Sequence, residues 1–296
     1  MHIVVHGGAG RVPDHPAPRA TMVESAAQAG SAADSPVRAV CAAIGVLERS
    51  PRFNAGVGSA VQSDGRIRTD AGMMTDSGDI GAACAMPGVR DAIAVANAVR
   101  TNTPHVLLAG ERAVDFAESV GIRTDHELFT EQTRDRWDDA DIDDASMSAQ
   151  RAFVSEQFGN GHDTVGAVAT DGEHVVAGTS TGGRWFALAG RVGDVPQVGC
   201  GYVASPAGGV SATGSGEAIA QTRLSQRALA HLDAGKTAAA AATHAIETFD
   251  QQTESEAGLI LLTPDGEVGQ AFSSDAMQWC HARDGSIIHH AQTQYL

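Results

Sequence analysis

Lysine is almost absent from this chain of 296 residues, since Lys236 is the one lysine and the other basic residues are arginines. Lys and Arg together number 20 against 36 Asp and Glu, which gives a net charge of −16. Nucleic-acid phosphates and anionic lipids bind to basic surfaces, so we expect neither partner. A surface this acidic predicts a protein from a high-salt cytoplasm, where ions screen the self-repulsion. An ordinary acidic cytosolic protein is the alternative.

Aromatic residues, cysteine pairs and long apolar runs are also scarce. Aromatics make up 4% of the chain and glycines number 34, so the core must pack through small side chains. No C-x-x-C pair exists, which argues against a zinc site or a disulfide scaffold and predicts reduced thiols at Cys41, Cys84, Cys200 and Cys280. No run reaches the ~20 apolar residues that span a bilayer, and MHIVVHGGAG has no basic leader. We therefore expect a cytoplasmic protein.

A chain of 296 residues is long enough for one large domain or two ordinary ones, and its 43% of hydrophobic residues allows a sizeable buried core. Residue patterning predicts helices at 19–30, 36–48, 91–100, 111–119, 214–230 and 237–249, and strands at 2–5, 65–74, 80–86, 164–170, 174–179, 259–263, 268–273 and 286–290. A glycine-rich turn is expected at 6–10, and a mobile connection at about 130–162, where a charged surface helix, above all near 149–158, is the alternative. Neither half alternates strand and helix regularly, so an α+β fold with two antiparallel sheets covered by helices fits best.

Thr164 opens the apolar segment TVGAVA directly after the glycine-containing stretch GNGHD. If the bond between Asp163 and Thr164 breaks, Thr164 gains an α-amine, with an ordinary pKa near ~8, beside its own hydroxyl. One residue then supplies both a nucleophile and a base. Taken alone, a threonine at the start of a strand is explained by strand propensity. The hypothesis therefore depends on further motifs.

Three glycine-rich segments follow in the second half of the chain. GTSTGG (178–183) places hydroxyls at the end of a predicted strand. GRVGDVP (190–196) places a guanidinium and a carboxylate three residues apart, which a surface ion pair would also explain. SATGSGE (211–217) leads into a predicted helix, so its backbone N–H groups and hydroxyls can face an anion.

Together with HGGAG (6–10) and FNAG (53–56), these segments resemble the plant-type L-asparaginase/isoaspartyl peptidase family of N-terminal-nucleophile hydrolases, over residues 4 to about 285. The resemblance implies a four-layer αββα sandwich formed by one domain, 1–296. It implies self-cleavage before Thr164 into chains 1–163 and 164–296, which remain intertwined, and a homodimer of these processed units. It implies no organic cofactor and no catalytic metal.

The resemblance also assigns catalytic roles to particular positions. Thr164 would be the nucleophile, and Thr181, from the S-T-G-G motif, would hydrogen-bond to it. Thr213 and Gly214, from T-G-x-G, would form the oxyanion hole with a hydroxyl and a backbone N–H.

Substrate recognition is assigned in the same way. Arg191 would bind the α-carboxylate of the substrate and Asp194 its α-ammonium, while Gly216 would add a backbone contact and Asn54 would reach the active site. The loop at 47–57 resembles a structural sodium loop, with ligands from the backbone carbonyls of Leu47, Glu48, Ser50, Phe53, Ala55 and Val57.

The expected substrate is a small molecule: L-asparagine, hydrolysed to aspartate and ammonia, or a β-aspartyl dipeptide. Most asparaginases of this type have glycine before the nucleophile, whereas this chain has Asp163, as glycosylasparaginases do. Hydrolysis of glycosylated asparagine is therefore an alternative, and a catalytically dead binding relative is another. A nucleotide-binding module is disfavoured because the glycines lack the G-x-G-x-x-G spacing and the G-K-[ST] lysine.

Overall fold

Two β-sheets form the centre of the molecule in this computed structural model, which describes residues 1–13, 15–140, 142, 146–157 and 164–295. The larger sheet has eight strands in the order β12-β11-β1-β5-β6-β2-β3-β4, and the smaller has four in the order β10-β9-β8-β7. Neighbouring strands pair antiparallel except β3 and β4, which run parallel. The prediction of a mixed α+β fold is confirmed at this level.

The elements have the following bounds. The strands are β1 (His2–Gly10), β2 (Arg68–Thr75), β3 (Ile80–Pro87), β4 (Leu107–Ala109), β5 (Val165–Thr170), β6 (Val175–Thr181), β7 (Tyr202–Ser205), β8 (Gly208–Gly214), β9 (Ala257–Leu262), β10 (Val268–Phe272), β11 (Ala276–Arg283) and β12 (Ser286–Tyr295). The helices are α1 (Pro16–Ser31), α2 (Pro36–Glu48), α3 (Ala92–Asn102), α4 (Glu111–Ser119), α5 (Glu131–Asp138), α6 (Met147–Gln157), α7 (Gly216–Thr222), α8 (Leu224–Asp233) and α9 (Ala238–Gln252).

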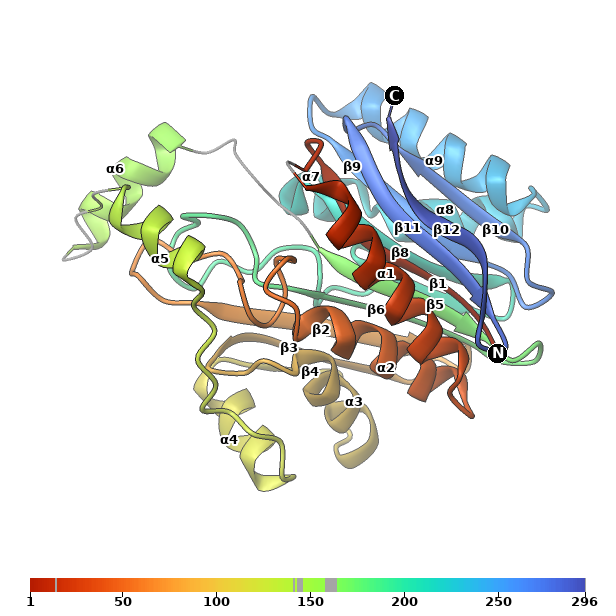
Figure 1. The fold of residues 1–296 in the computed structure, drawn as a ribbon, viewed down its shortest axis with the longest axis horizontal. Coiled ribbons are helices and arrows are strands. Elements are labelled where there is room, and N and C mark those ends of the chain that lie inside the picture. Colours follow the sequence, from red (N-terminus) through yellow and green to blue (C-terminus); the bar gives the residue numbers. More distant parts are fainter. Residues whose placement is uncertain (14, 141, 143–145, 158–163, 296) are drawn as a thin grey trace.

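Side chains that alternate along the strands divide the core between the faces of the sheets. Ile3 of β1 packs with α1 and α2 on one face of the large sheet, whereas Val4 points to the other face and meets Ile260 of the small sheet. Leu261, beside Ile260, points outward and packs with Phe249 of α9. Figure 1 shows α1 and α2 against the large sheet, and α8 and α9 beside the small one. Burial of β1 on both faces explains its continuous apolar run, IVV.

The prediction of a glycine-rich turn at residues 6–10 is wrong. β1 continues to Gly10, and its pairing with β11 shifts register between His6 and Ala9. Gly8 lies in this irregularity with φ 113°, a conformation that side chains other than glycine rarely adopt. The glycines therefore form a β-bulge, and the strand continues beyond it.

Several other boundaries also differ from the prediction. The single helix predicted at 214–230 is divided into α7 and α8 by Arg223, which has a left-handed φ of 52°. The strands β4, β7, β8 and β11 were not predicted as strands. By contrast, α2 and α4 begin and end where the sequence pattern predicts.

The segment expected to be a mobile connection, 130–162, carries two helices, α5 and α6. Thr130 caps α5 in a reciprocal arrangement with Thr133, in which each side chain accepts a hydrogen bond from the backbone N–H of the other residue. The surface helix considered as the alternative, expected near residues 149–158, is confirmed as α6, and α5 is a second, charged helix in the same segment. The expected cleavage residue Asp163 lies outside the described residues.

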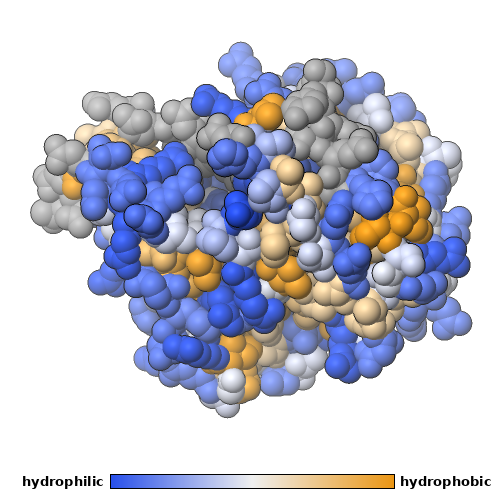
Figure 2. Space-filling model, viewed as in Figure 1, coloured by the Kyte–Doolittle hydropathy of each residue, from blue (hydrophilic) through white to orange (hydrophobic). Residues whose placement is uncertain are grey.

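Hydrophilic residues cover most of the face seen in Figure 2, and hydrophobic residues appear there in separate patches. Across the described part of the chain, no helix combines the length and apolar character needed to cross a membrane.

Candidate active site

Strand pairing brings Thr164 beside Thr181. Thr164 directly precedes β5, which pairs antiparallel with β6 so that Val165 lies opposite Ser180. The same register carried one residue further places Thr164 next to Thr181, the last residue of β6. Thr164 is 5% exposed, and the Thr181 hydroxyl accepts the N–H of Gly183 at 3.0 Å. The two hydroxyl residues named from the sequence therefore come together at one end of the large sheet.

The end of β8 adds Thr213 and Gly214. The Thr213 hydroxyl oxygen accepts the backbone N–H of Thr164 at 3.3 Å and that of Ala9 at 3.4 Å. With both acceptor positions used, the hydroxyl proton of Thr213 is directed toward a third group. Gly214 has φ 135°, and a Cβ there would lie 2.5 Å from the carbonyl oxygen of Glu256. Glycine is thus required where β8 ends.

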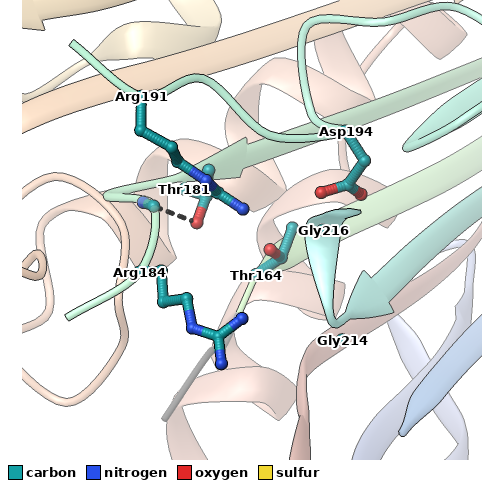
Figure 3. A pocket seen from close by; sticks show the side chains of 8 residues that line it. Thr164, Thr181, Arg184, Arg191, Asp194, Gly214 and Gly216 are labelled. Carbon is teal, nitrogen blue, oxygen red and sulfur yellow. Dashed lines mark hydrogen bonds between the residues drawn. The ribbon is translucent and has the colours of Figure 1, made fainter. Parts of the chain in front are cut away.

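These strand ends surround a small cavity, with about 210 Å³ of empty space when its opening to solvent is included (Figure 3). Six of the residues proposed from the sequence line it, together with Gly183 and Arg184: Thr164, Thr181, Arg191, Asp194, Gly214 and Gly216. Thr213 does not line the cavity but bonds to Thr164 from behind it.

Arg191 forms its ion pair with a residue that the sequence analysis did not assign. Its Nε and Nη2 donate to the two carboxylate oxygens of Glu217 at 2.7 and 2.9 Å. This fork fixes the guanidinium plane at the cavity wall. The alternative interpretation, a surface ion pair between Arg191 and Asp194, is wrong. Both residues are mostly buried, and Arg191 pairs instead with Glu217 of α7. The sequence feature that could have identified Glu217 is its position at the end of the TGSGE motif.

Asp194 is a buried carboxyl group facing the cavity. It is 4% exposed, and burial raises its pKa to about 7, although Arg191 acts in the opposite direction. Its Oδ2 has no hydrogen-bond partner among the described residues. A Cβ on Gly216 would lie 2.7 Å from Asp194 Oδ1 and 2.7 Å from Arg191 Nη2. The missing side chain at Gly216 thus leaves both charged groups open to a ligand of mixed charge.

A protein-family model described as asparaginase matches residues 1–291 of the chain. An isoaspartyl peptidase/L-asparaginase of Danio rerio is 36% identical over 295 residues, covering 96% of this chain and 93% of that protein. A plant-type L-asparaginase of Pyrococcus horikoshii is 35% identical, with 96% of each chain covered. An isoaspartyl peptidase/L-asparaginase of Rattus norvegicus is 36% identical, covering 96% of this chain and 87% of that protein. The chain belongs to the asparaginase family. The resemblance inferred from the motifs is confirmed.

In this asparaginase-family structure, Asn54 supports the site from outside the cavity lining. Its Nδ2 donates to the carbonyl of Gly183 at 2.6 Å, and its Oδ1 accepts the N–H of Ala60 at 2.8 Å. Its backbone carbonyl accepts the N–H of Gly182 at 2.9 Å. Asn54 therefore holds the loop that follows Thr181, and its contact with substrate stays a prediction.

Besides Glu217, two charged residues of the site were missed by the sequence analysis. Arg184 lines the cavity, and its Nη1 lies 3.6 Å from Glu217 Oε2. Asp70 lies on β2 opposite Thr181 and accepts the N–H of Ala85 at 2.6 Å; burial raises its pKa to about 6. Neither stands in a segment that the family resemblance singled out, and only the fold brings them to the site.

The glycine of the TVGA segment makes room for a hydrogen bond between the two sheets. His6 Nε2 and the Ser211 hydroxyl lie 2.8 Å apart, and both side chains are fully buried. A Cβ on Gly166 would lie 2.0 Å from that hydroxyl oxygen. Burial lowers the pKa of His6 to about 3, so the imidazole is neutral at physiological pH. This contact links β8, which carries Thr213, to β1, the neighbour of the strand that follows Thr164.

Proposed function

We propose that this chain is a self-processing amidohydrolase that hydrolyses L-asparagine and β-aspartyl dipeptides with Thr164 as nucleophile. The observation that carries the proposal is the position of Thr164 between two further hydroxyls and a pair of opposite charges, Arg191 and Asp194. The names of the relatives, L-asparaginase and isoaspartyl peptidase, support both substrates.

Processing would hydrolyse the peptide bond between Asp163 and Thr164 and yield chains 1–163 and 164–296. Strand order supports a lasting association, because β5 and β6 lie between β1 and β2 in one sheet. β5 and β11 of the second chain would keep their hydrogen bonds to β1, and β6 would keep its hydrogen bonds to β2. Apolar clusters between helices and sheet, between the two sheets, and between sheet and helices support a four-layer αββα sandwich.

Catalysis would proceed by two acyl transfers. The α-amine of Thr164 accepts the proton of its Oγ, which attacks the β-carbonyl carbon of the substrate. Thr213 Oγ–H and the Gly214 N–H donate to the resulting oxyanion, and one such donor contributes about 3 kcal/mol. The C–N bond then breaks, and the nitrogen takes the proton and leaves as ammonia or an amino acid. Water adds to the ester, gives a proton back to Thr164 Oγ, and aspartate is released.

Arg191 and Asp194 would orient the substrate for this attack. The guanidinium can bind an α-carboxylate while it keeps its fork to Glu217, since it has five N–H donors. The buried Asp194 carboxylate suits an α-ammonium, because a buried charge is stabilised by an opposite charge within hydrogen-bond distance.

Direct assays test the proposal and its nearest competitor. Asp163 favours glycosylasparagine as a second candidate substrate. Purified protein should release ammonia from asparagine and amino acids from β-aspartyl dipeptides, and do so faster than it hydrolyses glycosylasparagine. Thr164→Ala should abolish both self-cleavage and turnover. Ammonia release by an unprocessed Thr164→Ala protein would overturn the mechanism.

Sodium binding at 47–57 is a further part of the proposal. The N–H of Val57 bonds to the carbonyl of Glu48, and a Cβ on Gly56 would lie 2.2 Å from that oxygen. The loop therefore closes around this carbonyl, and an oxygen with two lone pairs can accept a second ligand. A Tm that is higher in NaCl than in choline chloride at equal ionic strength would support the site; equal values would count against it.

Assembly and salt adaptation complete the proposal. We expect a homodimer of processed units, which light scattering would detect as twice the chain mass. With a net charge of −16, unfolding should shift to higher temperature as KCl is raised to molar concentrations. A midpoint that does not change with KCl would remove the high-salt assignment.

A further inference from the structure

Arg184 places a second guanidinium in the cavity. It is 6% exposed and lines the same cavity as Thr164 and Arg191. Glu217 already binds Arg191 through both carboxylate oxygens at 2.7 and 2.9 Å, whereas Arg184 lies 3.6 Å from one of them. Burial lowers the pKa of Arg184, but a guanidinium stays charged at neutral pH. Arg184 and Arg191 thus share the Glu217 carboxylate, and both guanidinium groups line the cavity.

The proposed recognition of asparagine does not use Arg184. Arg191 and Asp194 account for the two charged groups of asparagine, and its remaining polar group is the reacting amide. A β-aspartyl dipeptide carries a second carboxylate, on the amino acid that leaves. Within this substrate class, that carboxylate is the group whose charge is opposite to that of Arg184.

The position of Arg184 matches the leaving side of the substrate. Figure 3 shows its side chain approaching Thr164 from the side opposite Asp194. Asp194 marks the aspartyl end of the substrate, and Thr164 attacks the carbonyl between that end and the leaving group. The leaving group therefore extends past Thr164, away from Asp194 and toward Arg184.

The residues after Arg184 are packed against the helices α5 and α6. The guanidinium of Arg136 lies 4.0 Å from the ring centroid of Trp185. Phe186 packs edge-on against Phe153 of α6, with ring centroids 5.6 Å apart. These contacts order the backbone that carries Arg184, which lowers the entropic cost of binding a ligand.

We propose that Arg184 is a specificity-determining residue that binds the free α-carboxylate of the leaving amino acid in β-aspartyl dipeptides. The inference rests on the proposed function and deepens it, because it distinguishes dipeptides with a free C-terminus from those whose C-terminus is blocked. The preferred substrate is then a β-aspartyl dipeptide, and a longer or C-terminally amidated isoaspartyl peptide is hydrolysed less efficiently.

The wild-type enzyme provides the first test. kcat/KM is measured for β-aspartyl-leucine and for β-aspartyl-leucinamide, which differ only in the leaving carboxylate. A buried charge-assisted hydrogen bond predicts a preference of about 10- to 100-fold for the free acid. Equal values would overturn the inference while leaving the proposed function intact. Failure to hydrolyse either dipeptide or asparagine would overturn the proposed function, and the inference with it.

The variant Arg184→Met provides the second test. Its readout is the ratio of kcat/KM for β-aspartyl-leucine to kcat/KM for β-aspartyl-leucinamide, because a general loss of activity lowers both values equally and leaves the ratio unchanged. The ratio should fall toward one, and Arg184→Lys should restore part of it. Arg112→Met removes an equal charge at an exposed position of α4 and should keep the wild-type ratio. An unchanged ratio in Arg184→Met would contradict the role. If this variant does not mature, the wild-type comparison decides.

Discussion

The backbone nitrogen of Thr164 donates a hydrogen bond to the hydroxyl oxygen of Thr213, over 3.3 Å. Cleavage before Thr164 would turn this nitrogen into the α-amine that acts as the base. Thr213 would then contact the base of the reaction through its oxygen and the oxyanion through its proton. The two functions proposed for the strand ends β5 and β8 meet at one hydroxyl.

Thr213→Val should therefore lower kcat far more than it changes KM. The side chain keeps its shape but loses the hydroxyl, so the oxyanion loses one donor, and we expect kcat to fall about 100- to 1000-fold. Steady-state kinetics on the processed fraction, quantified by gel, measures this change. Thr213→Ser keeps the hydroxyl and should retain most of the activity. A Thr213→Val enzyme with normal kcat would exclude the oxyanion role.

Binding of an α-ammonium at Asp194 should weaken below neutral pH. Burial raises the pKa of this carboxyl to about 7, so it becomes protonated as the pH falls from 8 to 6 and loses its attraction for a cation. Inhibition by L-aspartate, measured as Ki, should weaken over this range. Succinate lacks the ammonium and is the matched control, whose Ki should not rise in parallel. Parallel curves would show that another group is responsible.

Glu48 should make the folded state less stable as the pH rises from about 4.5 to 7. Burial raises its pKa from 4.5 to about 7, so the folded protein binds more protons than the unfolded chain within this window. The loss from this group is on the order of 3 kcal/mol. Asp70 and Asp194 shift in the same direction.

Glu48→Gln tests this contribution by urea unfolding at pH 5 and pH 8. An amide oxygen can still accept from the N–H of Ile93 and the hydroxyl of Ser180. The variant should lose less stability between the two pH values than the wild type does. Glu247→Gln, at an exposed position of α9, serves as the control. A loss in Glu48→Gln equal to that of the wild type would contradict the assignment.

Gly216→Ala should impair substrate binding without unfolding the protein. The added methyl would lie 2.7 Å from Arg191 Nη2 and 2.7 Å from Asp194 Oδ1, so both groups must shift. Displaced charge-assisted contacts predict a KM increase of about 10- to 100-fold. Gly45→Ala, within α2, meets only the flexible end of Arg49 and should leave KM unchanged. A normal KM in Gly216→Ala would mean that substrate binds elsewhere.

Local sequence patterns predicted those elements whose cause is local. α2 has Pro36 in its first turn and Ser35 as a capping residue, and both of its ends were placed correctly. β8 reads GGVSATG, and nothing in these residues marks a strand. It becomes one because it pairs with β7 and β9, the latter more than forty residues further along the chain. Likewise, only the tertiary fold makes HGGAG a bulged strand.

The candidate site shows the same division. Motifs identified Thr164, Thr181 and Arg191 by number, because each stands in a short segment of distinctive composition. The pairing of Arg191 with Glu217, 26 residues away, depends on where α7 begins. Arg184 has no motif of its own, and its relevance follows from the cavity alone. Sequence motifs therefore predicted residues that the fold brings together, whereas their electrostatic partners could be identified only from the fold.

Self-cleavage at one bond is the central claim, and intact-mass analysis of purified, active protein tests it most directly. The account predicts two chains with the masses of residues 1–163 and 164–296, and a single full-length chain for Thr164→Ala. Active wild-type protein that consists only of the full-length chain, or whose second chain begins at a residue other than Thr164, would contradict it.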